Sequence, residues 1–338
     1  VVYNDFQEKS NFIPLKEKND MNDYFDVFDI SQPKVKLLSN GEYSVAATDL
    51  GAVVAIYQGR DIYVRTLDLA RRPQGCYFAL LCNDEISYFS FLPAYCQKSE
   101  QSVEFLENEV NYYSNTKILE SGMRIVLHKN LPCEFRQFAV KNTSSSPQTV
   151  SLLCYIEPAL MKLSDYNAHP AFAKLFFKME YDEANSIVYI TRKSRNDSSE
   201  IHCAIGFLQP DGFICNFSRE EMLPYPLEGK RIFENAKFLE NNACHIPDPC
   251  VFIKKNLTLA PKEQKSCTLF ICSALTRDEL YKNIAEIREE KLVTANDVPS
   301  PIKASSIEGR IASLILPQIL FKRRDSAEND EAIAQNVL

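Results

Sequence analysis

Long segments of this chain alternate apolar and polar side chains with a period of two, and this constrains the fold more than any other feature. In the segment 149–157 the residues that share one side are Val150, Leu152, Cys154 and Ile156. Ser151 and Tyr155 point to the other side. Successive side chains of a β-strand face opposite ways, so the pattern predicts a half-buried strand. The segment 251–259 repeats the alternation, and 266–272 returns after a turn at 260–263.

Turn-forming residues separate these segments at hairpin spacing. The expected hairpins and meander are 41–47 with 52–58 around the turn 48–51, 77–82 with 86–92, and the three strands 123–128, 134–141 and 149–157, whose second turn is 142–147. The chain has only 9 glycines and few helical windows. Together these features predict a mainly β fold, a large antiparallel sandwich closed by successive hairpins.

The period changes after residue 275. Thr276 and Glu279 form a capping box for a helix that runs to about Glu290. A proline-bearing link at 298–301 leads to apolar residues at helical spacing in 307–319, where Pro317 is expected to kink or end the helix. We therefore expect an N-terminal arm at 1–37, a β-sandwich at 38–275, its C-terminal helix at 276–298, and a short helical linker at 299–338 toward a neighbour outside this chain.

Charge and hydropathy exclude several classes of protein. The 338 residues are 45% hydrophobic and 25% charged, which is enough for a substantial core, and the net charge of -7 argues against a general nucleic-acid binder. No run of eighteen apolar residues is present, so no transmembrane segment is expected. The segment 1–10 has no signal-peptide pattern, although the chain begins with Val and a removed signal stays open.

Cysteine usage points to a reducing compartment. The 11 cysteines are odd in number, form no CxxC pair and often lie within apolar alternating segments. Free cysteine packs as a small apolar residue, so we expect reduced core thiols in a cytoplasmic protein. Cys244, His245 and Cys250 have a spacing that matches no established zinc pattern, and no metal site is expected.

Several pieces of the chain carry a family resemblance through their order and spacing. They are 38–45 with the turn 48–51, 142–144 leading to 154–157, His169 to Phe176 followed by 180–182, and 248–251 through 259–263. Over about residues 37–290 they resemble the N-terminal β-supersandwich domain of glycoside hydrolase family 94. That family includes the phosphorylases of cellobiose, chitobiose and β-1,2-oligoglucans, and cyclic β-1,2-glucan synthase.

The resemblance implies a galactose mutarotase-like supersandwich within a modular enzyme. In such an enzyme an (α/α)6 barrel, absent from this chain, holds the general-acid Asp and the site for phosphate, the co-substrate; no cofactor is implied. The implied partners are that barrel, a β-glucan oligosaccharide and a second copy in a homodimer. The implied location is the cytoplasm, or the cytoplasmic face of the inner membrane for a cyclic glucan synthase. Such domains often carry tryptophan near 61–68, whereas this chain has no tryptophan.

Two patches are candidates for carbohydrate or interface contacts. The first consists of Tyr57, Arg60, Asp61, Tyr63, Arg65 and Asp68. Asp61, Tyr63 and Arg65 would share one face of a strand, but ion pairing of Asp61 or Asp68 with Arg65 explains the same residues. The resemblance favours an inter-subunit or interdomain contact there.

The second patch consists of His169, Phe172 and Lys174, which could form a polar and aromatic lip for a sugar. In the alternative interpretation Phe172, Phe176 and Phe177 belong to the core and His169 caps a loop. No catalytic residue is assigned, because the acidic pairs at 84–85, 182–183 and 220–221 fall in apparent turns or at sheet edges.

Three functions stay open at this point. The first is a non-catalytic supersandwich domain that supports a catalytic barrel and a dimer interface. The second is an aldose mutarotase-like epimerase, which needs a His and a carboxylate. The chain has 4 histidines and no His–carboxylate pair was evident. The third is a free-standing carbohydrate-binding module, against which the lack of tryptophan stands.

Overall fold

The computed structural model describes residues 23–25, 33–65, 75–92, 99–194, 199–222, 233, 236, 240–242 and 248–289. The expected linker at 299–338 lies outside these residues, as do Asp68, Cys244 and His245. Within the expected arm, residues 23–25 and 35–37 lie in strands. One of them, β2 (Val35–Ser39), crosses the boundary expected at residue 38.

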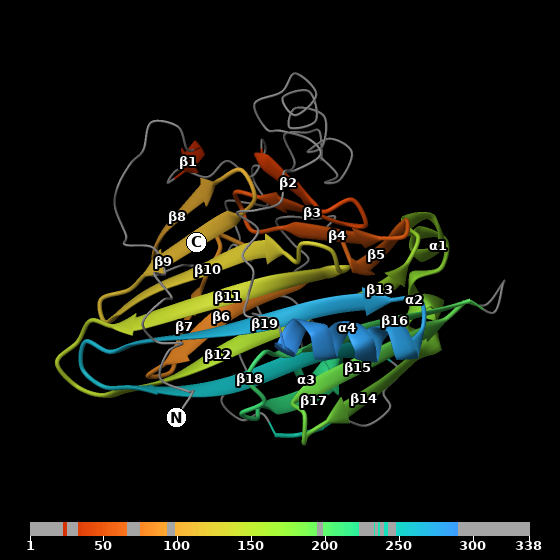
Figure 1. Cartoon of the computed structure of the whole chain (residues 1–338). Helices are drawn as coiled ribbons and strands as arrows, with labels where there is room; N and C mark the ends of the chain where they lie inside the picture. The colour runs from red at the N-terminus through yellow and green to blue at the C-terminus, as the bar shows by residue number, and fades with distance from the viewer. Residues whose placement is uncertain are drawn as a thin grey trace.

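The described residues form a nine-stranded sheet and two five-stranded sheets (Figure 1). The nine-stranded sheet has the order β1 (Asp23–Phe25), β8 (Glu100–Phe105), β9 (Val110–Asn115), β10 (Leu119–Leu127), β11 (Cys133–Asn142), β19 (Gln264–Ala274), β16 (Glu200–Phe207), β15 (Ile187–Lys193) and β14 (Phe177–Asp182). One five-stranded sheet has the order β17 (Ile214–Ser218), β18 (Pro249–Leu259), β12 (Gln148–Ile156), β6 (Cys76–Cys82) and β7 (Glu85–Tyr88). The other has the order β13 (Pro158–Met161), β5 (Arg60–Tyr63), β4 (Val53–Tyr57), β3 (Tyr43–Thr48) and β2.

Neighbouring strands in all three sheets are antiparallel throughout the described part of the chain. The helices are short: α1 (Leu163–Ala168), α2 (Pro170–Ala173), the 3-10 helix η1 (Lys174–Phe176), α3 (Arg219–Met222) and α4 (Arg277–Glu289). No helix among the described residues is long and apolar enough to cross a membrane. The predicted mainly antiparallel β fold with a C-terminal helix is confirmed.

The main core lies between the nine-stranded sheet and the two smaller sheets. It includes Phe138 of β11, Leu152 of β12 and Val45 of β3, so side chains from all three sheets pack together. In Figure 1 the large sheet crosses the front of the molecule, and strands β6, β12, β18 and β17 lie behind it. Burial of these apolar faces is the main favourable term for the fold.

Strand β12 is buried on both faces, so the half-buried strand predicted for it is wrong. Val150, Leu152, Cys154 and Ile156 do share the main core, as the alternation predicted. Tyr155, however, packs on the opposite side, in a second core that covers the outer face of this sheet. The tyrosine ring is apolar enough to be buried there while its hydroxyl finds a polar partner.

Two of the expected hairpins are instead crossings between sheets. Strands β11 and β12 do not pair with each other: β11 pairs with β19, and β12 pairs with β18 and β6. The connection from β18 to β19 crosses in the same way. The two crossings are joined by Asn142, whose side-chain amide donates to the carbonyls of Leu259 at 3.3 Å and Ala260 at 3.1 Å. The second half of the predicted meander is therefore wrong, while its first hairpin, β10–β11, and the hairpins β3–β4 and β6–β7 are confirmed.

Helix α4 covers part of the outer face of the nine-stranded sheet through Leu280, Ile284 and Ile287. Its start confirms the Thr276 half of the capping box, because the Glu279 amide donates to Thr276 Oγ1 at 3.2 Å. The Glu279 carboxylate accepts from the amide of Leu275, also at 3.2 Å. The helix is described as far as Glu289, and the rest of the expected segment lies outside the described residues.

The described cysteines pack as the sequence predicted. Nine of them are free thiols, and all nine are buried. Burial raises the pKa of the Cys267 thiol to about 12, so this group stays protonated and unreactive at neutral pH. Among the described residues no group of three or more His, Cys, Asp or Glu could hold a metal ion.

The turn at 48–51 supplies a test of the packing. Gly51 has φ +94°, and a Cβ added there would lie 2.1 Å from Ser90 Cβ; Gly41 has φ +97° with nothing within 4 Å of its Cβ position. We expect Gly51→Ala to lower the free energy of unfolding by about 3 kcal/mol, since it adds a clash to backbone strain. Gly41→Ala should cost about 1 kcal/mol, from strain alone. Equal losses in urea unfolding would contradict this packing.

Candidate functional site

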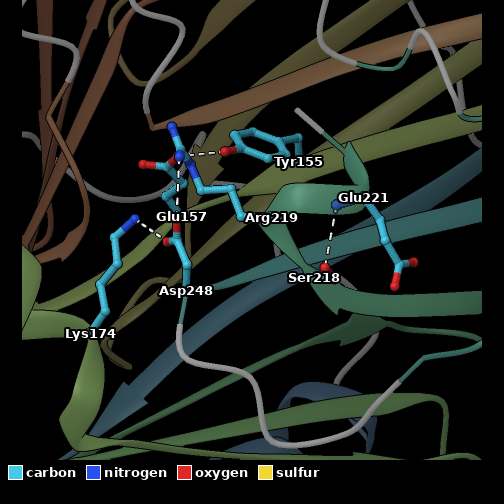
Figure 2. Close-up of polar contacts among 7 residues, drawn as sticks. All are labelled: Tyr155, Glu157, Lys174, Ser218, Arg219, Glu221 and Asp248. Carbon is cyan, nitrogen blue, oxygen red and sulfur yellow. Dashed lines mark hydrogen bonds and ion pairs between the residues drawn. The ribbon is translucent and has the colours of Figure 1, made fainter. Parts of the chain in front are cut away.

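Charged side chains from four segments contact one another in a row, as Figure 2 shows. We call Glu157, Arg219, Asp248 and Lys174 the ionic cluster. Glu157 lies between β12 and β13, Lys174 begins η1, Arg219 begins α3 and Asp248 directly precedes β18. The sheet order brings these positions together although they are far apart in sequence.

The contacts run from a buried carboxylate to an exposed one. Arg219 Nε lies 2.6 Å from Glu157 Oε1, and Arg219 Nη1 lies 3.3 Å from Asp248 Oδ2. The Tyr155 hydroxyl donates to Glu157, and the Lys174 ammonium pairs with Asp248. The Glu157 side chain is 1% exposed, whereas that of Asp248 is 46% exposed. The cluster is therefore fixed at its inner end and open to solvent at its outer end.

The electrostatics of the cluster favour fixed charges. Burial lowers the pKa of Arg219, but Glu157, Tyr155 and Asp248 together outweigh this, so that the pKa is raised overall. Burial, and then Glu157, raise the pKa of Tyr155. Arg219 therefore stays charged and Tyr155 stays a neutral hydrogen-bond donor. The contacts of Glu157 therefore hold α3 against the segment that follows β12.

Helix α3 is held in place by its own polar contacts. The Glu221 amide donates to Ser218 Oγ at 3.3 Å, which caps the first turn (Figure 2). The Glu221 carboxylate accepts from the side-chain amides of Asn216 at 2.6 Å and Asn242 at 2.7 Å. These contacts fix the helix and so direct Arg219 toward Glu157.

The segment that carries Lys174 also carries the predicted lip. His169 is exposed, and its ring meets that of Phe172 edge-on at 6.0 Å between centroids. Phe172 is 58% exposed and the neighbouring Leu175 is 54% exposed. The alternative of a core position holds for Phe177, which is buried, but not for Phe172. The structure thus places His169 and Phe172 together at the surface, with Lys174 held by Asp248.

The patch predicted around residue 61 is divided by the structure. Asp61 accepts two hydrogen bonds from Arg65, at 2.6 Å and 2.8 Å, which is the internal ion pair given as the alternative. Tyr57 and Tyr63 are buried in the main core. Arg60 donates to the backbone carbonyl of Gln58 at 3.4 Å, and Asp68 lies outside the described residues. A contact role for this patch stays a prediction.

Glu134 and Arg136 form a second buried ion pair, which was not predicted from the sequence. Glu134 and Arg136 are both 0% exposed and lie 2.7 Å apart. The Tyr43 hydroxyl donates to Glu134 at 3.3 Å, and Arg136 donates to the Tyr63 hydroxyl at 3.0 Å. Burial raises the pKa of Glu134, and Arg136 opposes this shift. Opposite charges two residues apart in an apolar strand were the available signal, because such residues share a face.

The outer face of the nine-stranded sheet carries a hollow of about 440 Å³ that was also missed. Its lining includes Lys178, Thr191, Glu200, His202, Leu275 and Arg277. His202 Nε2 lies 3.6 Å from Glu200 Oε2. The expectation of no His–carboxylate pair is therefore wrong, because Glu200 and His202 are two residues apart on β16 and share a face.

Comparisons with known proteins place the fold in a family. Residues 25–290 match the family model described as "Glycosyl hydrolase 94, supersandwich domain". The chain belongs to this family, and the match is to its supersandwich domain.

Individual relatives are distant. Cyclic beta-(1,2)-glucan synthase NdvB of Rhizobium meliloti (strain 1021) is 24% identical over 162 residues, which cover 47% of this chain and 6% of NdvB. A bacterial glucoamylase complexed with acarbose is 10% identical, with a TM-score of 0.47 over 80% of this chain and 38% of that one. A galactose mutarotase related enzyme from Lactobacillus acidophilus is 9% identical, with a TM-score of 0.41 over 72% of this chain and 98% of that one. The chain thus matches only a small part of NdvB.

Proposed function

We propose that this chain is a non-catalytic supersandwich domain that supports a catalytic (α/α)6 barrel and a dimer interface. The parent would be an inverting β-glucan phosphorylase or a cyclic β-1,2-glucan synthase, acting on a β-glucan oligosaccharide, with phosphate as the co-substrate of a phosphorylase. The observation that carries this proposal is that buried carboxylates of the domain are held by arginine side chains.

Inverting chemistry on a glycosidic bond needs a general acid and an activated nucleophile directed into one cleft. Asp61 is paired with Arg65, Glu134 with Arg136, and Glu157 with Arg219. Each of these carboxylates is buried and is held by an arginine side chain of the same domain. This pairing supports a role in the fold for these acids, and we propose that the chemistry belongs to the barrel.

Asp49 is a fourth buried carboxylate and is not a member of the ionic cluster. It accepts a hydrogen bond from the Lys34 amide at 3.0 Å, beside the turn that begins at Thr48. Burial raises its pKa to about 6, and backbone hydrogen bonds oppose the shift. Its contact with the backbone supports a structural role at the turn.

The surface near the ionic cluster supports a contact with another domain or subunit. Phe172 and Leu175 expose large apolar side chains, and exposed apolar side chains grouped on one segment are typical of interaction surfaces. The ion pair of Lys174 with Asp248 holds this segment against the sandwich. We place the contact with the barrel or the second copy at this lip. The buried free thiols support a cytoplasmic location.

The proposal is tested in the complete gene product, with the barrel that we propose it to contain. Phe172→Ser with Leu175→Ser should lower conversion of β-1,2-glucan at least about tenfold, since two interface anchors are lost. Asn167→Ser, a change at an exposed position of α1, is the matched control and should leave conversion unchanged. Thermal unfolding of the isolated chain should be the same for all variants. Unchanged conversion in the double variant would refute the interface at the lip.

A further inference from the structure

The hollow on the outer face of the nine-stranded sheet is built from a row of neighbouring strands. Lys178 of β14 is paired in register with Thr191 of β15, and Thr191 is paired with His202 of β16. Leu275 and Arg277 close one side, where β19 ends and α4 begins. Because α4 starts only at Arg277, this part of the sheet face is not covered by the helix. The volume of about 440 Å³ falls within the range of about 300–1,000 Å³ that is typical of ligand sites.

His202 is held rigidly at the base of this row. Its residue is 5% exposed, and its Nδ1 lies 2.9 Å from Thr191 Oγ1. Burial lowers the pKa of the imidazole, so the ring is neutral at pH 7 and offers one donor and one acceptor nitrogen. The separation of 3.6 Å between Nε2 and the Glu200 carboxylate is too long for a direct hydrogen bond. Because Nδ1 contacts Thr191, Nε2 is the ring nitrogen that a bound molecule could contact, next to the Glu200 carboxylate.

The charges around the hollow balance each other. Glu180 Oε1 lies 3.0 Å from Lys178 Nζ, and Glu180 Oε2 lies 2.9 Å from Arg277 Nη2. Glu200 supplies a second carboxylate, so two cations face two carboxylates. This balance disfavours a strongly charged ligand of either sign.

Other ligand classes fit less well. The described residues contain no group of metal-ligating side chains that could hold an ion here. Leu275, which is 43% exposed, is the one large apolar side chain among the described lining residues, whereas the other lining side chains carry hydrogen-bonding groups. What the hollow offers is a dense mixture of hydrogen-bond donors and acceptors beside one apolar side chain.

We infer that this hollow is a binding site for a neutral saccharide. Each sugar hydroxyl both donates and accepts a hydrogen bond, which matches an imidazole, a carboxylate, an ammonium and a guanidinium in one row. The C–H face of the ring would contact Leu275. Binding here requires no chemistry, so the inference is separate from the absence of catalysis proposed above.

The test is a titration of the isolated chain followed by NMR of its imidazoles, of which the sequence has 4. Sophorose, laminaribiose and cellobiose are the probes, and inorganic phosphate is the anionic comparison. We expect a saturable shift of the His202 signal with at least one disaccharide and none with phosphate. Glu200→Ala, at a half-exposed side chain that need not affect folding, should weaken binding about 3- to 10-fold through the loss of a hydrogen bond.

Glu183→Ala is the matched control, because this exposed glutamate lies in the turn between β14 and β15 and outside the lining of the hollow. It should bind as the unchanged chain does. The inference is overturned if no disaccharide gives a saturable shift, if Glu200→Ala and Glu183→Ala bind equally well, or if phosphate alone binds. None of these results would bear on glucan conversion by the complete gene product.

Discussion

Replacing Arg136 by methionine should lower the free energy of unfolding by about 3–5 kcal/mol, because it leaves the carboxylate of Glu134 buried without its partner. Both side chains of this pair are 0% exposed, so water cannot solvate the remaining charge. The Tyr43 hydroxyl still donates to Glu134, but one neutral donor at 3.3 Å does not offset the lost cation. The effect is expected in urea unfolding followed by far-UV circular dichroism.

The double variant Glu134→Leu with Arg136→Met is the control for this prediction. Replacing both members of a buried ion pair by apolar residues is often close to neutral, because no unpaired charge remains. We expect the double variant to be more stable than Arg136→Met alone. The prediction would be contradicted if Arg136→Met lost less than about 1 kcal/mol, or if the double variant were less stable than the single one. Either result would mean that an unpaired buried charge on Glu134 does not cause the loss of stability.

Arg219→Met is expected to have the second largest effect, a loss of about 3 kcal/mol. Glu157 is 1% exposed and would keep only the Tyr155 hydroxyl as a partner. Lys174→Met should cost less than about 1 kcal/mol, since Asp248 is half exposed and retains its contact with Arg219 at 3.3 Å. The expected losses of stability therefore differ because Arg219→Met leaves a buried carboxylate without its arginine, whereas Lys174→Met leaves a half-exposed one without its lysine.

A double-mutant cycle of Arg219→Met and Glu157→Gln measures this coupling directly. We expect a coupling free energy of at least about 1 kcal/mol, and a smaller one for Lys174→Met with Asp248→Asn. Equal coupling in the two cycles would mean that burial does not distinguish the inner from the outer end of the ionic cluster. The same measurements test whether the lip segment depends on Lys174 for its stability.

The local elements of this fold could be predicted from the sequence. The alternation of Val150, Leu152, Cys154 and Ile156 marks one face of β12, and the pair Thr276 and Glu279 marks the start of α4, because both signals arise from neighbouring residues. The pairing of strands could not be predicted in the same way. An alternating strand has the same pattern whether it turns back beside its neighbour or crosses to another sheet, as β12 does after β11.

The candidate site shows the same division. Lys174 was singled out in the sequence, but its partners depend on the order of strands: Asp248 lies 74 residues away, and Glu157 lies 62 residues from Arg219. The pairs Glu134–Arg136 and Glu200–His202 were within reach, because each joins opposite polar groups two residues apart on a strand. An alternation of apolar residues marks the apolar face of a strand, and it does not show which polar residues on a strand contact each other.

The most direct test of the central claim, a supersandwich domain whose acids serve the fold, is an activity assay on the purified chain with β-1,2-glucan and inorganic phosphate. We expect no release of sugar phosphate or free sugar above a protein-free control, with circular dichroism showing that the chain is folded. Release that is abolished by Glu157→Gln or Glu134→Gln, in variants that remain folded, would contradict the account.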